Sequence, residues 1–234
     1  MLIKAAMRSA EAGHLADQIR CLERSGIDAL HFDVMDGHFV PEICAGPSLI
    51  RGLRRYTQLP FEVHLLVEHP ERWVESYVAA GSNVILLHLE ALSDPGEALR
   101  QVRQQGCRAG LAIRPETPAH AMRPYLEWCD TINVMTVTPG VPGQLNPDGL
   151  KRLAETSELV HAAGGGPLVQ ADGAVSLATR AQFLQVGARS LVAGYPIFSA
   201  GEMRTAITQL RWGAASGECM DMGAATHQPM RGKA

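Results

Sequence analysis

The sequence predicts a single-domain (β/α)₈ barrel, also called a TIM barrel, and three observations support this prediction. Short apolar or β-branched runs alternate with charged amphipathic stretches about eight times along the chain. A glycine stands between the two kinds of stretch at Gly26, Gly81, Gly106 and Gly187, where a helix C′ glycine would end a helix. No GxGxxG or GxxxxGK[ST] motif follows the first strand, which disfavours an open doubly wound nucleotide-binding sheet, the alternative.

The strands of the first half follow from these patterns in order. The chain opens on a short run at 2–6, and the second strand, 28–34, follows Gly26 in CLERSGIDALHFD. The third strand, 61–67, is the apolar run FEVHLLV, interrupted by one histidine. The fourth, 83–88, follows Gly81 in YVAAGSNVILLH. Helical patterns fill the intervals, so each helix leads into the next strand.

The second half repeats the arrangement. Gly106 precedes a strand at 108–113 in RQQGCRAGLAI, and Gly187 precedes the last strand, 189–193, in FLQVGARSLVAG. Between them we expect strands at 130–137 and 167–172. From about Gly213 the periodicity stops and Gly and Ala become frequent, so the barrel is expected over 1–212 and a flexible tail over 213–234.

Composition excludes several classes of protein. The net charge of −3 and the lack of a Lys/Arg stripe argue against nucleic-acid binding. No run approaches the about 20 apolar residues that span a bilayer, and the N-terminus lacks a secretory signal, so we expect a cytoplasmic protein without membrane contact. The five cysteines are scattered, without a CxxC pair, as in a reducing compartment. An anionic small molecule stays possible, because backbone amides bind phosphate without net positive charge.

The segment ALHFDVMDGHFVPE, residues 29–42, carries the first candidate site. Side chains alternate across a strand, so His31, Asp33 and Met35 share one face. If that face points into the barrel, His31 and Asp33 lie near its mouth, where active sites of this fold are found.

Two later strands offer matching groups. His64 interrupts an apolar strand, and Asp172 ends another just before Gly173. Taken alone, His64 is more often a buried structural residue, and Asp172 a turn residue. Together with His31 and Asp33 they would supply two nitrogens and two oxygens to one small cavity, a set that suits Zn²⁺, Mn²⁺, Fe²⁺ or Co²⁺. The other histidines are interpreted as structural or exposed, except that His88, close to Glu90, could support the site.

Five motifs together resemble the ribulose-phosphate 3-epimerase family over about residues 2–212: HFDVMDGHFVP, EVHLLVEHPERW, VMTVTPGVPGQ, ADGAVS and VAGYPIF. The resemblance implies a divalent metal held at His31, Asp33, His64 and Asp172. It also implies that Asp33 and Asp172 exchange protons with a substrate carbon, one on each face. Removing a proton next to a ketone gives an enediolate, whose charge a metal stabilises. Met35 and Met135 would then line the substrate pocket.

The resemblance is looser where family members grip phosphate. That end would comprise Gly140, Gly143, Gln144, Gly173, Ala174, Gly194 and Tyr195. Pro142, Ala174 and Tyr195 depart from the family pattern there, and Pro142 removes a possible amide donor. In the first strand Ala6 replaces a common substrate-contacting serine. Arg8 is expected either to contact a substrate anion or to be a solvated charge.

Three hypotheses follow for the function. The first is a metal-dependent isomerase, an epimerase acting at C3 of a ketopentose phosphate of the ribulose 5-phosphate type. The second is an epimerase or aldose-ketose isomerase of the same family for another sugar or sugar phosphate, as the altered phosphate end would allow. The third is a catalytically silent ligand-binding barrel, which the complete metal-ligand set disfavours. The resemblance also suggests a homo-oligomer.

Overall fold

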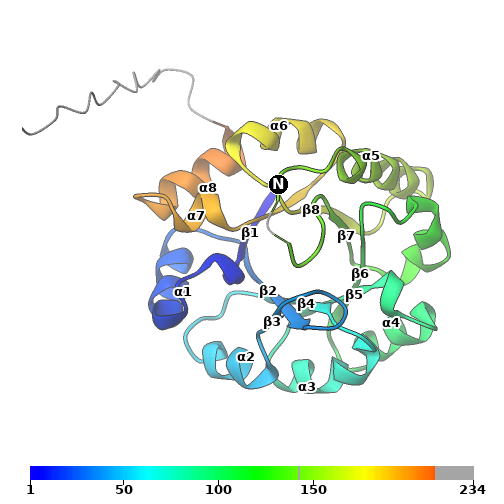
Figure 1. Cartoon of the computed structure of the whole chain (residues 1–234), viewed down its shortest axis with the longest axis horizontal. Coiled ribbons are helices and arrows are strands. Elements are labelled where there is room, and N and C mark those ends of the chain that lie inside the picture. The colour runs from blue at the N-terminus through cyan, green and yellow to red at the C-terminus, as the bar shows by residue number, and fades with distance from the viewer. Residues whose placement is uncertain (142, 214–234) are drawn as a thin grey trace, which may run out of the picture.

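The computed structural model describes residues 1–141 and 143–213, which form a closed barrel with helices around it (Figure 1). Eight parallel strands make the barrel wall: β1 (Leu2–Ala6), β2 (Ala29–Asp36), β4 (Phe61–Leu66), β5 (Val84–His88), β6 (Arg108–Ile113), β7 (Thr131–Met135), β8 (Leu168–Asp172) and β9 (Ser190–Ala193). The wall closes because β1 pairs with β2 on one side and with β9 on the other. The predicted (β/α)₈ barrel is therefore confirmed, with each strand within two residues of its expected bounds.

Helices connect the strands and cover the outside of the wall. The α-helices are α1 (Leu15–Arg24), α2 (Pro47–Arg54), α3 (Val74–Ala79), α4 (Pro95–Gln104), α5 (Pro147–Ala162), α6 (Leu177–Gln185), α7 (Tyr195–Phe198) and α8 (Met203–Trp212). Short 3₁₀ helices add η1 (Met7–Ser9), η2 (Ala12–His14), η3 (Pro70–Trp73), η4 (Leu89–Ala91) and η5 (Ala119–Trp128). Several ends are capped, as where Asp94 accepts from the Glu97 amide at 2.9 Å and starts α4.

The glycines expected to end helices have the backbone conformation that this role requires. Gly26, Gly81, Gly106 and Gly187 have φ values of 79°, 101°, 80° and 101°. An L-residue with a side chain rarely adopts that region, so glycine at these positions allows each helix to stop and turn into the next strand.

Each strand has an apolar outer face and an inner face that carries polar groups. The outer residues of β2, such as Phe32 and Val34, belong to the main hydrophobic cluster between strands and helices. The inner residues include His31, which is fully buried. A second, small cluster of Met35, Val40 and Leu66 lies apart from the main one. The strand alternation predicted for β2 is thus confirmed, and the hydrophobic core is the layer outside the strands.

Two elements were not anticipated. β3 (Ile43–Cys44) pairs antiparallel with the end of β2, so the chain folds back at the barrel mouth. The connection from β6 to β7 is the 3₁₀ helix η5 because Pro124 lies inside it, lacks an amide donor and prevents a regular α-helix.

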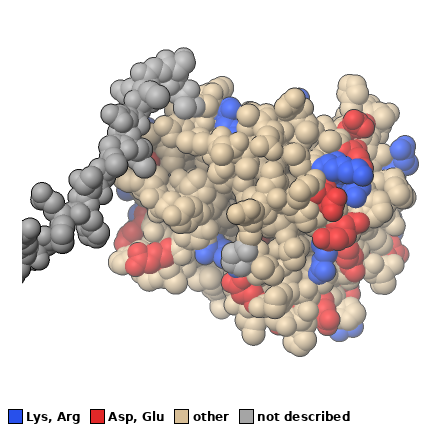
Figure 2. All heavy atoms as spheres, turned by 45° about the horizontal axis from the view of Figure 1, so that its top comes forward, with Lys and Arg blue, Asp and Glu red and all other residues tan. Residues whose placement is uncertain are grey.

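Several further features of the chain bear on the remaining sequence predictions. None of the described helices is long and apolar enough to cross a bilayer. Cys21, Cys44, Cys107 and Cys129 are free thiols. On the face in Figure 2, Lys and Arg lie among Asp and Glu, and the absence of nucleic-acid binding stays a prediction. Pro142, Cys219 and the predicted tail from residue 214 onward lie outside the described residues.

Candidate active site and metal centre

Four side chains from three strands meet inside the mouth of the barrel. β2 contributes His31 and Asp33, β4 contributes His64, and β8 contributes Asp172. One ligand atom from each lies within 4.8 Å of the others. We call these four residues the metal centre, after the ion that they could hold. The strand register brings them together, since Asp33 stands opposite His64 in the β2–β4 pairing.

The two imidazoles point at the same two carboxylates. His31 Nε2 lies 3.1 Å from Asp33 Oδ1 and 3.5 Å from Asp172 Oδ2. His64 Nδ1 lies 3.3 Å and 3.4 Å from the same two oxygens. Two nitrogens and two oxygens converging on one point form a donor set that fits Zn²⁺, Mn²⁺, Fe²⁺ or Co²⁺. The predicted convergence is present, and these residues could hold a metal ion.

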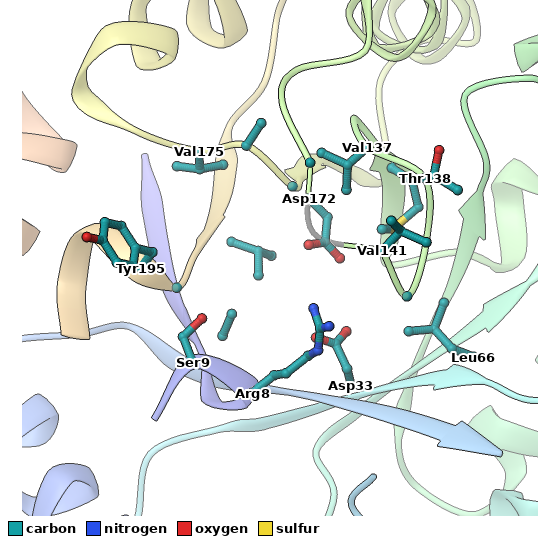
Figure 3. A pocket seen from close by; sticks show the side chains of 18 of the residues that line it. Arg8, Ser9, Asp33, Leu66, Val137, Thr138, Val141, Asp172, Val175 and Tyr195 are labelled. Carbon is teal, nitrogen blue, oxygen red and sulfur yellow. The ribbon is translucent and has the colours of Figure 1, made fainter. Parts of the chain in front are cut away.

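The second oxygen of each aspartate is free of the protein. Asp33 Oδ2 and Asp172 Oδ1 make no hydrogen bond to any residue that the structure describes. Both aspartates line the pocket, where they face one space from different strands (Figure 3). Each carboxylate therefore has one oxygen turned to the imidazoles and one available to a ligand.

Electrostatics hold the four groups together. At His31, burial lowers the pKa, but the charges of Asp172 and Asp33 outweigh it and raise the pKa well above its usual 6.5. At Asp33, burial raises the pKa, but His31 and His64 outweigh it and hold the pKa of the carboxyl far below 3.8. The carboxylates thus favour positive charge at this point, as a cation site requires.

His31 is oriented from behind by Glu62 of β4. Its Nδ1 donates to Glu62 Oε1 at 2.9 Å, and Glu62 also forms a buried ion pair with Lys4. Because an ionised carboxylate only accepts, Nδ1 carries a proton here. Nε2 is thus the nitrogen that would give up its proton and offer a lone pair to a metal ion.

His88 lies against the other histidine. Its ring stacks on His64 with centroids 4.9 Å apart, and its Nδ1 lies 2.8 Å from Glu90 Oε2. Burial is the main cause that lowers the pKa of His88 to about 4, so the ring is neutral near pH 7. The expected supporting contact beside the metal centre is present.

The two aspartates of the DVMDGHF segment, Asp33 and Asp36, have different surroundings. Asp36 accepts from the amides of His38, Phe39 and Glu68 at 2.8–2.9 Å. Burial raises the pKa of Asp36, but these three amides outweigh it and lower the pKa below 3.8. Asp36 is thus a loop residue, whereas Asp33, three positions earlier, faces the pocket.

The metal centre opens into a pocket of about 270 Å³. Its far wall is made by three segments at the ends of β7, β8 and β9: 138–141 with 143–146, 173–175, and 194–196, which includes the start of α7. We call them the phosphate loops, after the role that the family resemblance implies for them. Of the predicted substrate-binding residues, the pocket is lined by Arg8, Met35, Met135, Gly140, Gly143, Gly173, Ala174, Gly194 and Tyr195. Gln144 is exposed and does not line it. Ser9, Leu66, Val137, Thr138 and Val141 complete much of the wall (Figure 3).

The phosphate loops contain both tightly packed and solvent-exposed residues. Gly140 has φ 76°, and a Cβ there would lie 2.7 Å from the Val40 side chain. Ala174 also has a positive φ, 49°, although it carries a Cβ. The Tyr195 side chain stands at the rim, and the residue is 78% exposed.

Arg8 extends from η1 over the pocket toward Asp33 (Figure 3). Its Nε donates to Glu42 Oε1 at 3.1 Å, and Nη2 pairs with the other oxygen of Glu42. The hydrogen bond with Glu42 is the main cause that raises the pKa of Arg8. Nη1 has no hydrogen-bond partner among the described residues, so Arg8 can still donate to a ligand.

Several residues of the site were missed from the sequence. Glu42 comes from a loop, and Lys4, Glu62, Asn133, Gln170 and Ser190 lie behind the metal centre. The signal for the strand residues was present: each is a polar residue on the inner face of an otherwise apolar strand, as His64 is. Nothing in the sequence pairs Arg8 with Glu42.

Comparisons with known proteins identify the family of the chain and its fold relatives. The sequence profile of the ribulose-phosphate 3 epimerase family matches residues 2–198. A ribulose-phosphate 3-epimerase of Bacillus subtilis is 33% identical over 205 residues, which cover 87% of this chain and 94% of the relative. One of Mycobacterium bovis is 34% identical over 218 residues, 92% of this chain and 94% of the relative. In fold, the chain is similar to phosphoribosyl anthranilate isomerase of Thermus thermophilus, with a TM-score of 0.66, 16% identity and coverage of 90% and 98%.

Proposed function

This chain belongs to the ribulose-phosphate 3 epimerase family, and we propose that it epimerises a ketopentose phosphate of the ribulose 5-phosphate and xylulose 5-phosphate type at C3. It is an enzyme of the isomerase class, a carbohydrate epimerase. The proposal includes a sugar-phosphate substrate, dependence on a divalent metal, and proton transfer by Asp33 and Asp172.

One observation carries the mechanism: each aspartate turns one oxygen to the imidazoles and leaves the other free in the pocket. Inverting a carbon centre requires one group to remove a proton from one face and another to return a proton to the opposite face. Asp33 and Asp172 come from different strands and reach the same space, so the free oxygens can fill these two roles. Which aspartate starts depends on the epimer that binds.

The remaining groups bind and orient. A divalent cation held by His31 Nε2, Asp33 Oδ1, His64 Nδ1 and Asp172 Oδ2 would supply Lewis acidity, stabilising the negative charge that develops on the substrate oxygens. Met35, Met135 and Leu66 give this part of the pocket an apolar lining, which strengthens electrostatic interactions inside it. The phosphate loops would take the phosphate, with backbone amides as donors.

A different sugar or sugar phosphate is the second candidate, and the phosphate loops favour it. Tyr195 adds a bulky exposed ring at the rim, Ala174 adds a Cβ, and Arg8 adds a cation near Asp33. Among the described residues, none of these three side chains makes a hydrogen bond or ion pair with His31, Asp33, His64 or Asp172, so the same proton transfer could serve an altered substrate. A cytoplasmic location and a homo-oligomeric state stay predictions from the sequence.

Deuterium exchange from solvent tests both candidates. Elemental analysis of the purified protein would identify its metal. The protein, supplied with that metal in D₂O, would then be mixed with tetrulose, pentulose and hexulose phosphates and with the unphosphorylated sugars. We expect deuterium at C3 of ribulose 5-phosphate and xylulose 5-phosphate, read by NMR. Exchange confined to another sugar would favour the second candidate, and exchange with none would support the silent barrel.

A further inference from the structure

A chain of buried polar side chains crosses the barrel behind the metal centre. Lys4, Glu62, Asn133, Gln170 and Ser190 come from five different strands, and each is at most 5% exposed. Polar groups at this depth are costly unless they are hydrogen-bonded. Here each of them has a partner within the chain, so the set forms one connected network.

The hydrogen bonds in this network have a defined direction. Gln170 Nε2 lies 2.8 Å from Glu62 Oε1, and because an ionised carboxylate only accepts, this atom must be the amide nitrogen. Ser190 Oγ accordingly donates to Gln170 Oε1 at 2.9 Å. Gln170 Nε2 also donates to Asn133 Oδ1 at 2.9 Å, which leaves Asn133 Nδ2 to donate to Asp172 Oδ2 at 3.0 Å.

Two metal ligands are therefore held by the same network. Glu62 Oε1 receives both His31 Nδ1 at 2.9 Å and the Gln170 amide, while Lys4 pairs with the other oxygen. At the opposite end, Asp172 is held by Asn133 through the oxygen that faces the imidazoles. Gln170 is the only member of the five that bonds to both Glu62 and Asn133.

We propose that Glu62 and Gln170 are positioning residues: through one hydrogen-bond network they fix the orientation of His31 on one side of the metal centre and of Asp172 on the other. Glu62 fixes the His31 tautomer and ring orientation, and Gln170 transmits that arrangement through Asn133 to Asp172. A stability role alone accounts poorly for the arrangement, because a buried ion pair such as Lys4–Glu62 adds little net stability compared with apolar packing. The inference rests on the proposed metal centre and extends it to residues that touch neither metal nor substrate.

Cobalt binding gives a readout that does not depend on turnover. Co²⁺ would be titrated into metal-depleted full-length protein, with the visible absorption of the ion reporting both affinity and coordination geometry. We expect Glu62→Gln to weaken Co²⁺ binding about 10- to 100-fold and to change the spectrum, as loss of a residue that orients a ligand does. Thr131→Val is the matched control. Thr131 is a buried polar residue at the start of β7, its hydroxyl has no partner among the described residues, and its loss should leave binding unchanged.

A double-mutant cycle tests the link through Gln170. Asn133→Leu removes the donor to Asp172, and its effect on Co²⁺ affinity would be measured in wild type and in the Glu62→Gln background. If the network acts as a unit, the effect is at least about threefold smaller in that background. Equal effects in both would overturn the linking role of Gln170.

Other outcomes separate this inference from the proposed function. If wild type binds no Co²⁺, the metal centre itself is wrong, whereas wild-type affinity in a folded Glu62→Gln protein overturns only the positioning role. Circular dichroism of each metal-depleted variant would establish folding. Should Glu62→Gln fail to fold, Ser190→Ala replaces it. This substitution removes a hydrogen bond to Gln170, which is itself two hydrogen bonds away from His31 and from Asp172. We expect weaker Co²⁺ binding there too, and unchanged binding would again overturn the role.

Discussion

The metal centre and the phosphate loops belong to one pocket, yet they are held in different ways. His31, His64 and Asp172 lie within strands and are at most 7% exposed. Strand pairing places all three, and buried hydrogen bonds to Glu62 and Asn133 also hold His31 and Asp172. In the phosphate loops, Tyr195 and Val141 are 78% and 44% exposed. The part of the pocket that would perform the chemistry is therefore rigidly placed, whereas the part that would select the substrate can change without disturbing the barrel.

The largest expected effect comes from the metal centre. Asp33→Asn or Asp172→Asn should lower epimerisation about 10³-fold or more, because each removes one of the two proton-transfer groups. Each variant keeps the other aspartate, so exchange of solvent deuterium into one epimer should outlast net epimerisation. NMR of each epimer separately in D₂O measures both processes.

Two further variants test whether the loss of activity is specific to the two proton-transfer aspartates. Asp36→Asn changes a neighbouring carboxylate that bonds only to loop amides, and it should keep activity within about tenfold of wild type. His64→Ala removes a ligand but no proton-transfer group, so excess metal should restore part of its activity. Full activity of Asp172→Asn would remove this residue from the proton-transfer scheme.

The same contrast accounts for how much the sequence could predict. The convergence of His31, Asp33, His64 and Asp172 was predictable, because side chains alternate along a strand and parallel strands end at the same rim of the barrel. That they bind a metal stays a prediction. A turn at Gly173 was also predictable, because Asp-Gly is a common turn pair, and the φ of 108° there favours glycine. The Arg8–Glu42 ion pair was not predictable, because it joins η1 to a loop whose position depends on β3, a strand of two residues without a periodic signal.

A smaller effect is expected at Arg8, between the two regions. Arg8→Met should lower kcat/KM for the accepted substrate about tenfold, the loss expected for one charged hydrogen bond to a ligand. The unfolding free energy should fall by less than about 1 kcal/mol, because the ion pair with Glu42 is about one-third exposed. Steady-state kinetics and urea unfolding measure the two quantities.

Arg20→Met is the matched control for this change. Arg20 pairs with Asp17 at 2.9 Å on α1, away from the pocket, so its loss should leave kcat/KM unaltered. If Arg8→Met behaves like Arg20→Met, the Arg8 guanidinium is a solvated charge and contributes nothing to substrate binding.

The smallest effect concerns backbone strain in the phosphate loops. Ala174 has φ 49°, a conformation that costs a residue with a Cβ roughly 1–2 kcal/mol. Ala174→Gly relieves this strain but gives the unfolded chain more freedom, so we expect the unfolding free energy to rise by about 0.5–1 kcal/mol and the Tm by about 1–3 °C.

Ala45→Gly is the control, since Ala45 has φ 59° but lies outside the phosphate loops. Both variants should gain stability, and only Ala174→Gly should change KM, because only Ala174 lines the pocket wall where the substrate's phosphate would sit. An equal KM in both would mean that this loop does not touch the substrate, and that the divergence at Ala174 leaves substrate choice unchanged.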